Sequence, residues 1–146
     1  MLRTRLIHPE MLAALAAAGH GSQMLISDGN FPHATATPAG ARLVFLNLSP
    51  GRVTVTEVLE AVAPTVPLEA AAVMRPHDAD VPAVLGEYRA ILPPGLPVEV
   101  VDRLDFYELT RRPEVTLAVA TGDQRLYANL LLTIGYIDPA TEASRL

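Results

Sequence analysis

A histidine lies between two glycines near the amino end of the chain, at Gly19-His20-Gly21. An imidazole takes up and releases a proton near neutral pH, so an exposed one suits proton transfer to and from a small ligand. The flanking glycines have no side chains that would shield it. A loop histidine beside a helix-ending glycine has the same sequence, and both interpretations stay open from this tripeptide alone.

A second candidate is Asp28, which opens the segment Asp28-Gly29-Asn30-Phe31-Pro32 after an apolar run. Open α/β sheets usually bind ligands beyond the carboxyl ends of their strands. A carboxylate placed there accepts hydrogen bonds from sugar hydroxyls or acts as a base. The structural alternative is an aspartate that initiates a turn beside a buried phenylalanine.

Two more segments carry groups that bind polyols. Arg103 opens Arg103-Leu104-Asp105-Phe106-Tyr107-Glu108, and its guanidinium can donate to hydroxyls or pair with a nearby carboxylate. Tyr127 and Asn129 are two residues apart, so an extended segment would place the phenol and the amide on one face. An ion pair in the arginine segment, and a sheet-edge tyrosine followed by a turn-closing asparagine, are the structural alternatives.

Residue types that are missing exclude several reaction classes. The chain has no cysteine, which excludes thiolate nucleophiles and cysteine-based zinc or iron–sulfur sites. It has no lysine, which excludes Schiff-base chemistry and a lysine-bearing phosphate loop. The segment His77-Asp78-Ala79-Asp80 resembles no metal-ligand spacing, so we expect no metal site. Gly21-Ser22 lacks the pattern of a hydrolase nucleophile elbow.

The overall composition limits the class of protein further. The 146 residues fit one domain, of which 50% are hydrophobic and 18% charged. This apolar surplus favours burial between subunits. A net charge of −5 argues against nucleic-acid binding, and no apolar run approaches the roughly 20 residues that span a bilayer. The absence of cysteine fits a cytoplasmic protein.

Helical and extended patterns alternate along the chain, which indicates an α/β fold that must position these groups. We predict a helix over 9–18 that ends at a left-handed Gly19, a helix from a Thr54/Glu57 capping box to about 63, and helices over 82–92 and 105–111. The predicted strands span 24–27, 42–48, 70–74, 98–101, 115–120 and 127–134.

Strands separated by helices pair mostly in parallel, whereas the last two predicted strands have no helix between them, so one of them should run antiparallel. The predicted fold is therefore α/β: a single three-layer α/β/α domain over 1–146, with a mostly parallel mixed sheet of about six strands. Residues 138–146 are predicted to form a tail.

Taken together and in order, these segments resemble the D-ribose pyranase / L-fucose mutarotase family. The similarity covers most of the chain up to residue 137 and depends on several weak motifs that occur in the right order. Those motifs are Met11-Leu12-Ala13-Ala14-Leu15, Gly19-His20-Gly21, Leu25-Ile26-Ser27, Asp28-Gly29-Asn30-Phe31-Pro32, Arg103-Leu104-Asp105-Phe106-Tyr107-Glu108, Thr121-Gly122 and Tyr127-Ala128-Asn129.

The resemblance implies an isomerase that interconverts anomers or ring forms of a monosaccharide without a cofactor, in a ring-shaped, decamer-like homo-oligomer. It implies that His20 donates a proton. It also implies that Asp28, Arg103, Tyr127 and Asn129 contact the sugar substrate.

Arg103 bears on which sugar is bound. Ribose-type members of the family tend to carry a histidine at this position, and an arginine followed by Phe-Tyr-Glu resembles the fucose branch. We therefore predict a mutarotase for L-fucose or a related monosaccharide that works by general acid–base catalysis. The alternatives are a D-ribose pyranase, which interconverts pyranose and furanose rings, and a non-catalytic sugar-binding accessory of uptake.

The placement of His20 and Asp28 predicts a site shared between subunits. The two residues flank the first predicted strand, and even a four-residue strand separates its ends by roughly 13 Å at about 3.3 Å per residue. A pyranose ring is smaller than this distance. Either a loop folds back, or a neighbouring subunit completes the pocket.

Overall fold

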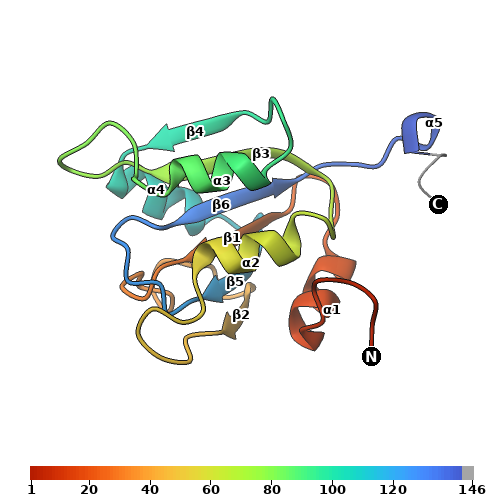
Figure 1. Ribbon diagram of the computed structural model, residues 1–146, viewed down its shortest axis with the longest axis horizontal. Helices are drawn as coiled ribbons and strands as arrows, with labels where there is room; N and C mark the ends of the chain where they lie inside the picture. Colours follow the sequence, from red (N-terminus) through yellow and green to blue (C-terminus); the bar gives the residue numbers. More distant parts are fainter. Residues whose placement is uncertain (143–146) are drawn as a thin grey trace.

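The computed structural model describes residues 1–142, with side chains described through residue 140. Its centre is a six-stranded sheet with the order β2-β5-β1-β6-β3-β4 (Figure 1). The strands are β1 (Gln23–Ser27), β2 (Arg42–Phe45), β3 (Leu68–Met74), β4 (Val98–Val101), β5 (Val115–Ala120) and β6 (Leu130–Ile134). The helices are α1 (Pro9–Ala17), α2 (Val55–Val62), α3 (Leu85–Ile91), α4 (Arg103–Thr110) and α5 (Pro139–Glu142).

Five strands run in one direction and β6 runs against them. β1 and β2 each pair in parallel with β5, and β3 pairs in parallel with β4, whereas β6 lies antiparallel to both β1 and β3. The carboxyl ends of the five parallel strands and the amino end of β6 therefore meet at one edge of the sheet. The predicted mixed sheet is confirmed. The sequence also predicts that one of the last two strands runs antiparallel, and β6 is that strand.

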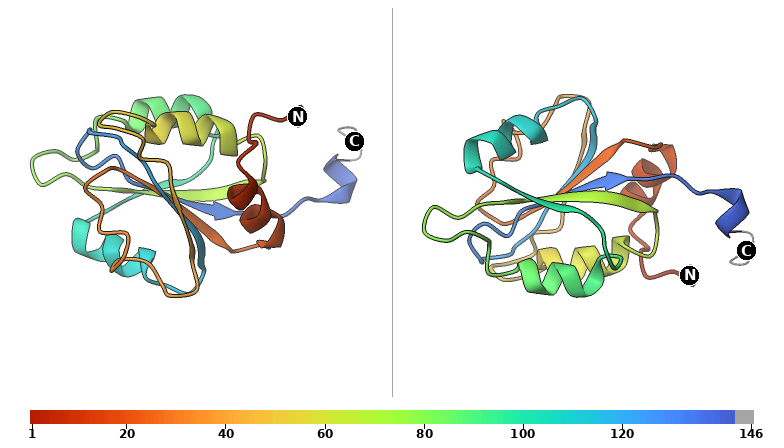
Figure 2. Two further views of the ribbon diagram at one scale, coloured as in Figure 1. Left: turned by 90° about the horizontal axis from the view of Figure 1, so that it is seen from below. Right: turned by 90° about the horizontal axis from the view of Figure 1, so that it is seen from above.

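Helices cover both faces of the sheet (Figure 2). α1, α2 and α3 contribute Met11, Leu59 and Tyr88 to the larger apolar core on one face. On the other face, Phe106 of α4 packs in a second core with Phe31 from the loop after β1. Alternate residues of a strand point to opposite faces, so each central strand supplies both cores. This is the predicted α/β/α layering.

The start of α2 is held by hydrogen bonds within its own first turn and by one from a distant loop. The hydroxyl of Thr54 accepts a hydrogen bond from the Glu57 N–H at 3.2 Å, while the Glu57 carboxylate accepts one from the Thr54 N–H at 2.7 Å. This is the predicted capping box. The buried Asp123 carboxylate also accepts the Val55 N–H at 3.0 Å, which ties the helix start to the β5–β6 loop.

The prediction of a left-handed Gly19 is wrong. α1 ends because Ala18 is extended, with its N–H bonded to the carbonyls of Ala14 and Leu15. The left-handed residue is Gly21, at φ 82°. The turn between them is closed by Ser22, whose N–H donates to the Gly19 carbonyl and whose hydroxyl accepts the Gly19 N–H.

The last strand is shorter than the predicted 127–134 and begins at Leu130. Tyr127 is left-handed, with φ 62°, and cannot continue an extended strand. The expectation that Tyr127 and Asn129 share a face of one strand is therefore wrong. Both residues belong to the β5–β6 loop.

Other boundaries also differ from the prediction, among them those of β2, α3 and α4. β2 ends at Phe45 rather than 48, since the Leu48 N–H turns back to the Leu46 carbonyl. α3 begins at Leu85 because residues 82–84 form a preceding turn. α4 begins two residues early, at Arg103, because its first turn is already closed by the hydrogen bond from the Phe106 N–H to the Asp102 carbonyl.

The carboxyl-terminal segment leaves the sheet after β6 and extends away from the body to α5 (Figure 1). α5 lies within the predicted tail, and residues 143–146 of that tail lie outside the described residues.

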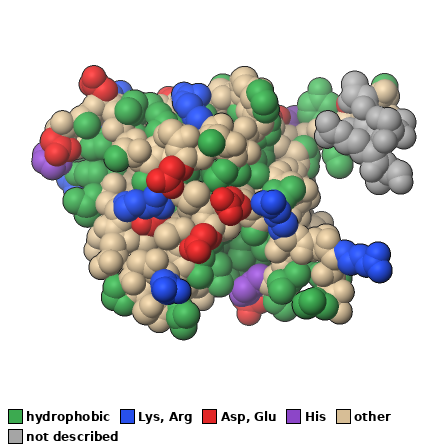
Figure 3. All heavy atoms as spheres, in the orientation of Figure 1, with side chains coloured by type: hydrophobic (Ala, Val, Ile, Leu, Met, Phe, Trp, Pro, Cys, Tyr) green, Lys and Arg blue, Asp and Glu red, His purple; other side chains and the backbone are tan. Residues whose placement is uncertain are grey.

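On the face shown in Figure 3, acidic and basic side chains lie next to one another over α2 and α3. No helix in the described part of the chain has the length and apolarity that a membrane crossing requires.

Candidate functional site

Asp28 and Asn129 form a buried pair at the sheet edge where the parallel strands end. Each side chain is 3% exposed. The Asn129 amide donates to the Asp28 carboxylate at 3.1 Å, and its carbonyl oxygen accepts the Asp28 N–H at 3.0 Å. The Asn30 N–H donates to the other carboxylate oxygen at 2.9 Å. The two bonds to the carboxylate fix its orientation, and the third holds the Asn129 side chain against the Asp28 backbone.

The environment of Asp28 also changes its acidity. Burial raises the pKa of its carboxyl above the ordinary value, because the charged form loses solvation. Hydrogen bonds from Asn30 and Asn129 act in the opposite direction but do not cancel this effect. The nearby Asp123 carboxylate raises the pKa further.

A cavity of about 180 Å³ opens beside this pair. Its size suits a small ligand rather than an extended one. The predicted sugar-contact residues Asp28, Arg103, Tyr127 and Asn129 all line it, although they come from three separate segments of the chain. The sheet brings them together because β1 and β4 end, and β6 begins, at the same edge.

The other residues that line the cavity were not predicted from the sequence as site residues. They are Asn30, Phe31, Met74, Tyr107 and Leu126. Tyr107 follows Arg103 by four residues on α4, and that helical spacing places the two side chains on one face. This signal was available in the sequence. Met74 comes from the end of β3, and no local pattern marks it.

Arg103 forms no ion pair among the described residues, contrary to the structural alternative for this segment. The nearby Glu108 carboxylate pairs instead with Arg111, at 2.8 Å. The guanidinium of Arg103 therefore lines the cavity without a carboxylate partner in residues 1–140.

The β5–β6 loop that carries Tyr127 and Asn129 is anchored at its start. The buried Asp123 carboxylate accepts hydrogen bonds from the Arg125 guanidinium at 2.7 and 3.0 Å. Burial would raise the pKa of Asp123, but the bonds from Arg125 and Val55 outweigh it and leave that pKa below its ordinary value. Gly122 has no room for a side chain, since an added Cβ would lie 2.0 Å from the Arg52 carbonyl oxygen.

A larger open depression of about 390 Å³ adjoins this loop. It shares Asn30 with the smaller cavity and is otherwise bordered by polar loop residues such as Asn47 and Gln124. None of the predicted catalytic or sugar-contact residues lines it. The 180 Å³ cavity is therefore the candidate site.

His20 lies at the opposite edge of the sheet, before β1. Its Nε2 lies 2.8 Å from the carboxylate of Glu69 at the start of β3, and the two side chains are 56% and 39% exposed. The Tyr136 ring lies edge-on to the imidazole, with 5.3 Å between ring centroids. If the Nε2–H donates to Glu69, the Nδ1 atom is left for a ligand. Glu69 had no signal in the sequence, because it is 49 residues from His20.

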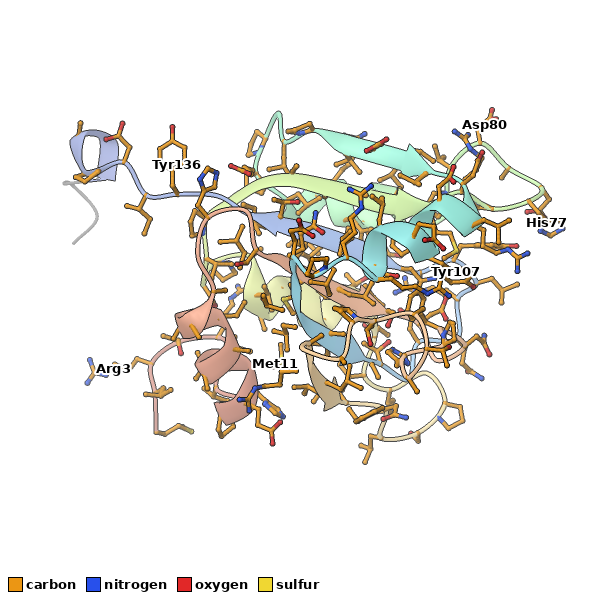
Figure 4. The ribbon with its side chains drawn as sticks, turned by 180° about the vertical axis from the view of Figure 1, so that it is seen from behind. Arg3, Met11, His77, Asp80, Tyr107 and Tyr136 are labelled. Carbon is orange, nitrogen blue, oxygen red and sulfur yellow. The ribbon has the colours of Figure 1, made fainter. Side chains whose placement is uncertain are left out.

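His20 and the cavity therefore do not meet within one chain. The five residues of β1 separate them, which is roughly 17 Å at about 3.3 Å per residue. Figure 4 shows this separation, with Tyr136 beside the His20 end of the molecule and Tyr107 at the cavity end. The four sugar-contact candidates are brought together, and the predicted proton donor is not.

His33 has a different environment from His20. Its Nε2 is hydrogen-bonded to the hydroxyl of Ser27, which is fully buried at the end of β1. Its ring packs edge-on against Phe31, with centroids 5.4 Å apart. Burial lowers the pKa of His33. This histidine holds the loop after β1 and does not line the cavity.

The segment around His77 holds no metal-ligand cluster. Within the described residues, no group of three or more His, Asp or Glu side chains is arranged to hold a metal ion. The imidazole of His77 instead lies 2.9 Å from the hydroxyl of Tyr127.

Comparison with known proteins agrees with the fold and with the order of motifs. The sequence profile of the RbsD / FucU transport protein family matches residues 1–137. The chain belongs to this family. The resemblance to the D-ribose pyranase / L-fucose mutarotase family is thereby confirmed.

Individual relatives of this RbsD/FucU family member fall into both branches. The human fucose mutarotase is 33% identical over 145 residues, covering 90% of each chain. The D-ribose pyranase of Paracidovorax citrulli is 31% identical over 135 residues, covering 92% of this chain and 98% of that protein. The crystal structure of the fucose mutarotase from Streptococcus pneumoniae in complex with L-fucose superimposes with a TM-score of 0.80 and 26% identity, over 94% of this chain and 100% of that one.

Proposed function

We propose that this protein is an isomerase, a sugar mutarotase that interconverts the α and β anomers of L-fucose or a related monosaccharide by general acid–base catalysis. The observation that carries the proposal is the 180 Å³ cavity whose wall contains Asp28, Arg103, Tyr127 and Asn129. A carboxylate, a guanidinium, a phenol and an amide together offer the donors and acceptors that a ring of hydroxyls requires. Relatives of both branches act on monosaccharides by name.

Anomer exchange needs two proton movements and no net change in the sugar. A proton is delivered to the ring oxygen as the bond between it and the anomeric carbon breaks, and another is removed from the anomeric hydroxyl. The open-chain aldehyde then rotates and closes on its other face, with the protons moving in reverse. Acid–base assistance of this kind contributes about 10²–10⁴-fold.

In this proposal His20 donates the proton. Its imidazole is exposed, and Glu69 bonds one ring nitrogen at 2.8 Å, which orients the ring and leaves the other nitrogen for the sugar. A carboxylate that holds a catalytic histidine in this way fixes its orientation and tautomer. Glu69 therefore joins the proposed site as the residue that orients His20.

Because His20 and the cavity lie at opposite ends of β1, the site is proposed to be completed by a neighbouring subunit. Exposed apolar side chains support contacts at both ends. At the cavity end, Leu126 lines the cavity and Leu104 follows Arg103, and they are 68% and 67% exposed. At the His20 end, Tyr136 and Ile137 are 68% and 62% exposed. A ring-shaped, decamer-like homo-oligomer would bring one end of each subunit to the other end of the next.

The activity is tested by saturation-transfer NMR on the anomeric proton signals of a sugar panel. The expected result is that catalytic amounts of protein raise the α/β exchange rate of L-fucose above its rate in buffer. If fucose, ribose and galactose all exchange at their buffer rates, the enzyme proposal fails. Sugar binding without faster exchange would favour the sugar-binding accessory instead.

The shared site is tested by mixing two variants, His20→Ala and Asp28→Asn, after dissociation and reassembly. Each variant should be nearly inactive alone. In a ring with random mixing, about one in four sites would combine an intact cavity with an intact histidine from the neighbour, so activity should partly return. If hybrid oligomers form and no activity returns, both residues act in one subunit's pocket.

The ribose pyranase relatives make D-ribose the second candidate substrate. The same NMR measurement separates the two, since pyranose and furanose forms of ribose give distinct anomeric signals. Faster pyranose–furanose exchange with no effect on fucose would assign the protein to the pyranase branch in spite of Arg103.

A further inference from the structure

The loop between β3 and α3 carries a histidine that contacts the sugar cavity indirectly. His77 lies at the tip of this loop, at the same end of the molecule as Tyr107 (Figure 4). Its Nδ1 lies 2.9 Å from the Tyr127 hydroxyl, and the two ring centroids are 6.3 Å apart. The spacing around His77 predicts no metal site, and this contact gives the side chain a different role.

Tyr127 needs support that its own loop does not supply. Its left-handed backbone is unfavourable for a residue with a side chain, so the surrounding structure must hold it. The residues on either side are anchored, by the bonds of Arg125 to Asp123 and of Asn129 to Asp28. These bonds hold the backbone and not the phenol. Within residues 1–140, His77 is the one hydrogen-bond partner of the phenol.

Tyr127 borders two cavities. It lines the 180 Å³ sugar cavity and also a second cavity of about 420 Å³ on the side of the β3–α3 loop. His77 lines only the second cavity. The imidazole therefore reaches the hydroxyl from the side that faces away from the sugar, and a sugar in the first cavity would not compete with it for space.

The loop that carries His77 is itself held in place. The Arg75 guanidinium donates to the Asp102 carboxylate at 2.8 Å and to the Asp80 carbonyl at 2.9 Å. These bonds brace the loop at its base and beyond its tip. The His77 side chain is 79% exposed, and its Nδ1 lies 3.8 Å from the Asp78 carboxylate. It contributes little to the core.

We propose that His77 is a positioning residue that fixes the direction of the Tyr127 hydroxyl and thereby strengthens sugar binding. This inference rests on the proposed function of the cavity. Depending on its tautomer, a neutral imidazole accepts a hydrogen bond from the phenol O–H at Nδ1 or donates one from Nδ1–H to the phenol oxygen. In both cases the hydroxyl has one fixed bond, so its remaining capacity is directed at the sugar.

The test measures the Kd for L-fucose by NMR titration, and KM and kcat by anomer exchange, in the full-length protein. His77→Ala should raise Kd and KM about three- to tenfold, the effect of one lost hydrogen bond, with kcat little changed. His77→Asn should recover most of the affinity, because its amide can occupy the place of Nδ1. Asp80→Asn, on the same loop, is the matched control and should behave as the wild type.

The decisive comparison is made in a Tyr127→Phe background, where His77→Ala should have no further effect. An unchanged Kd in His77→Ala, or an equal loss with and without the Tyr127 hydroxyl, would overturn the proposal while leaving the proposed function intact. If the wild type binds sugar without catalysing exchange, Kd alone still decides the role of His77. If the wild type binds no monosaccharide, both proposals fail.

Discussion

The two ends of β1 carry the two halves of the proposed chemistry, and they are constructed differently. At the carboxyl end, Asp28 and Asn129 are each 3% exposed and share two hydrogen bonds. At the amino end, His20 and Glu69 are 56% and 39% exposed and share one contact. Asp28 and Asn129 are held by each other before any ligand arrives, whereas the proposed proton donor lies at the surface.

This difference has a physical reason. A sugar is recognised by several hydroxyls at once, and preformed partners reduce the entropy that binding must overcome. A proton donor for a site in a neighbouring subunit must instead remain accessible on its own subunit. Changes at the exposed end should therefore affect catalysis alone, and changes at the buried end should affect both affinity and stability.

The largest effect is expected from His20→Ala. Anomer exchange should fall about 10²–10⁴-fold, because general acid assistance is lost. The melting temperature and the sugar Kd should change little, since the side chain is 56% exposed. Exchange NMR and thermal unfolding measure the two quantities. Full exchange in this variant would assign the acid to another group.

Asp28→Asn should have the next largest effect. It should distinguish the two ends of β1, because it should lower both sugar affinity and stability, whereas His20→Ala should lower catalysis alone. The two carboxylate oxygens of Asp28 accept from the Asn129 amide and from the Asn30 N–H, and an asparagine side chain has one oxygen for these two donors. Its NH2 group must therefore face one of them donor to donor. We expect at least about a tenfold loss of sugar affinity and a loss of about 1–3 kcal/mol in the free energy of unfolding. Urea denaturation and sugar titration measure these. Stability equal to the wild type would contradict the buried hydrogen-bonded pair.

Glu69→Gln should have a smaller effect and should mimic a weak version of His20→Ala. The amide keeps the size of the side chain but orients the imidazole less firmly, so exchange should fall about three- to tenfold. Sugar affinity measured by titration should stay at the wild-type value. A rise in Kd in this variant would mean that the His20 end contributes to binding.

Arg103→His tests the selectivity of the cavity at the carboxyl end of β1. The forked guanidinium and the imidazole present different donors, so the ratio of fucose exchange to ribose exchange should fall by a few-fold, about the effect of one altered hydrogen bond. The ratio is obtained from one exchange panel on both proteins. An unchanged ratio would show that Arg103 does not select the sugar.

The smallest effect concerns the pH dependence of stability. Because burial raises the pKa of Asp28 above its usual 3.8, the folded protein keeps a proton that the unfolded chain releases. The contribution of this group to stability therefore decreases as the pH rises from 3.8 through the raised value. Urea denaturation of the wild type and of Asp28→Asn over this range should show a more negative slope of stability against pH in the wild type. Equal slopes would contradict the raised pKa.

Much of the fold followed from local patterns. The 54–57 capping box and the apolar run of β5 predicted elements of the layers. The missing helix between the last two strands predicted that one of them runs antiparallel. Errors occurred where the path of the chain depends on distant contacts. The sequence around Tyr127 predicts a strand, but in the structure this segment is a loop. The loop places Asn129 in hydrogen-bond contact with Asp28, which is 101 residues away in the sequence.

The sequence by itself determined that Asp28 and Arg103 follow predicted strands, and parallel strands align their carboxyl ends at one edge of the sheet. Tyr127 and Asn129 precede the antiparallel β6, so it was the tertiary structure that brought them to the same edge. Only the tertiary structure decided which side chains support them. Glu69 reaches His20 across 49 residues, and His77 reaches Tyr127 across 50. Such pairs depend on strand order and loop path, which the pattern of any one segment does not contain. The same structure separates His20 from the cavity by the length of β1, because the two flank one extended strand.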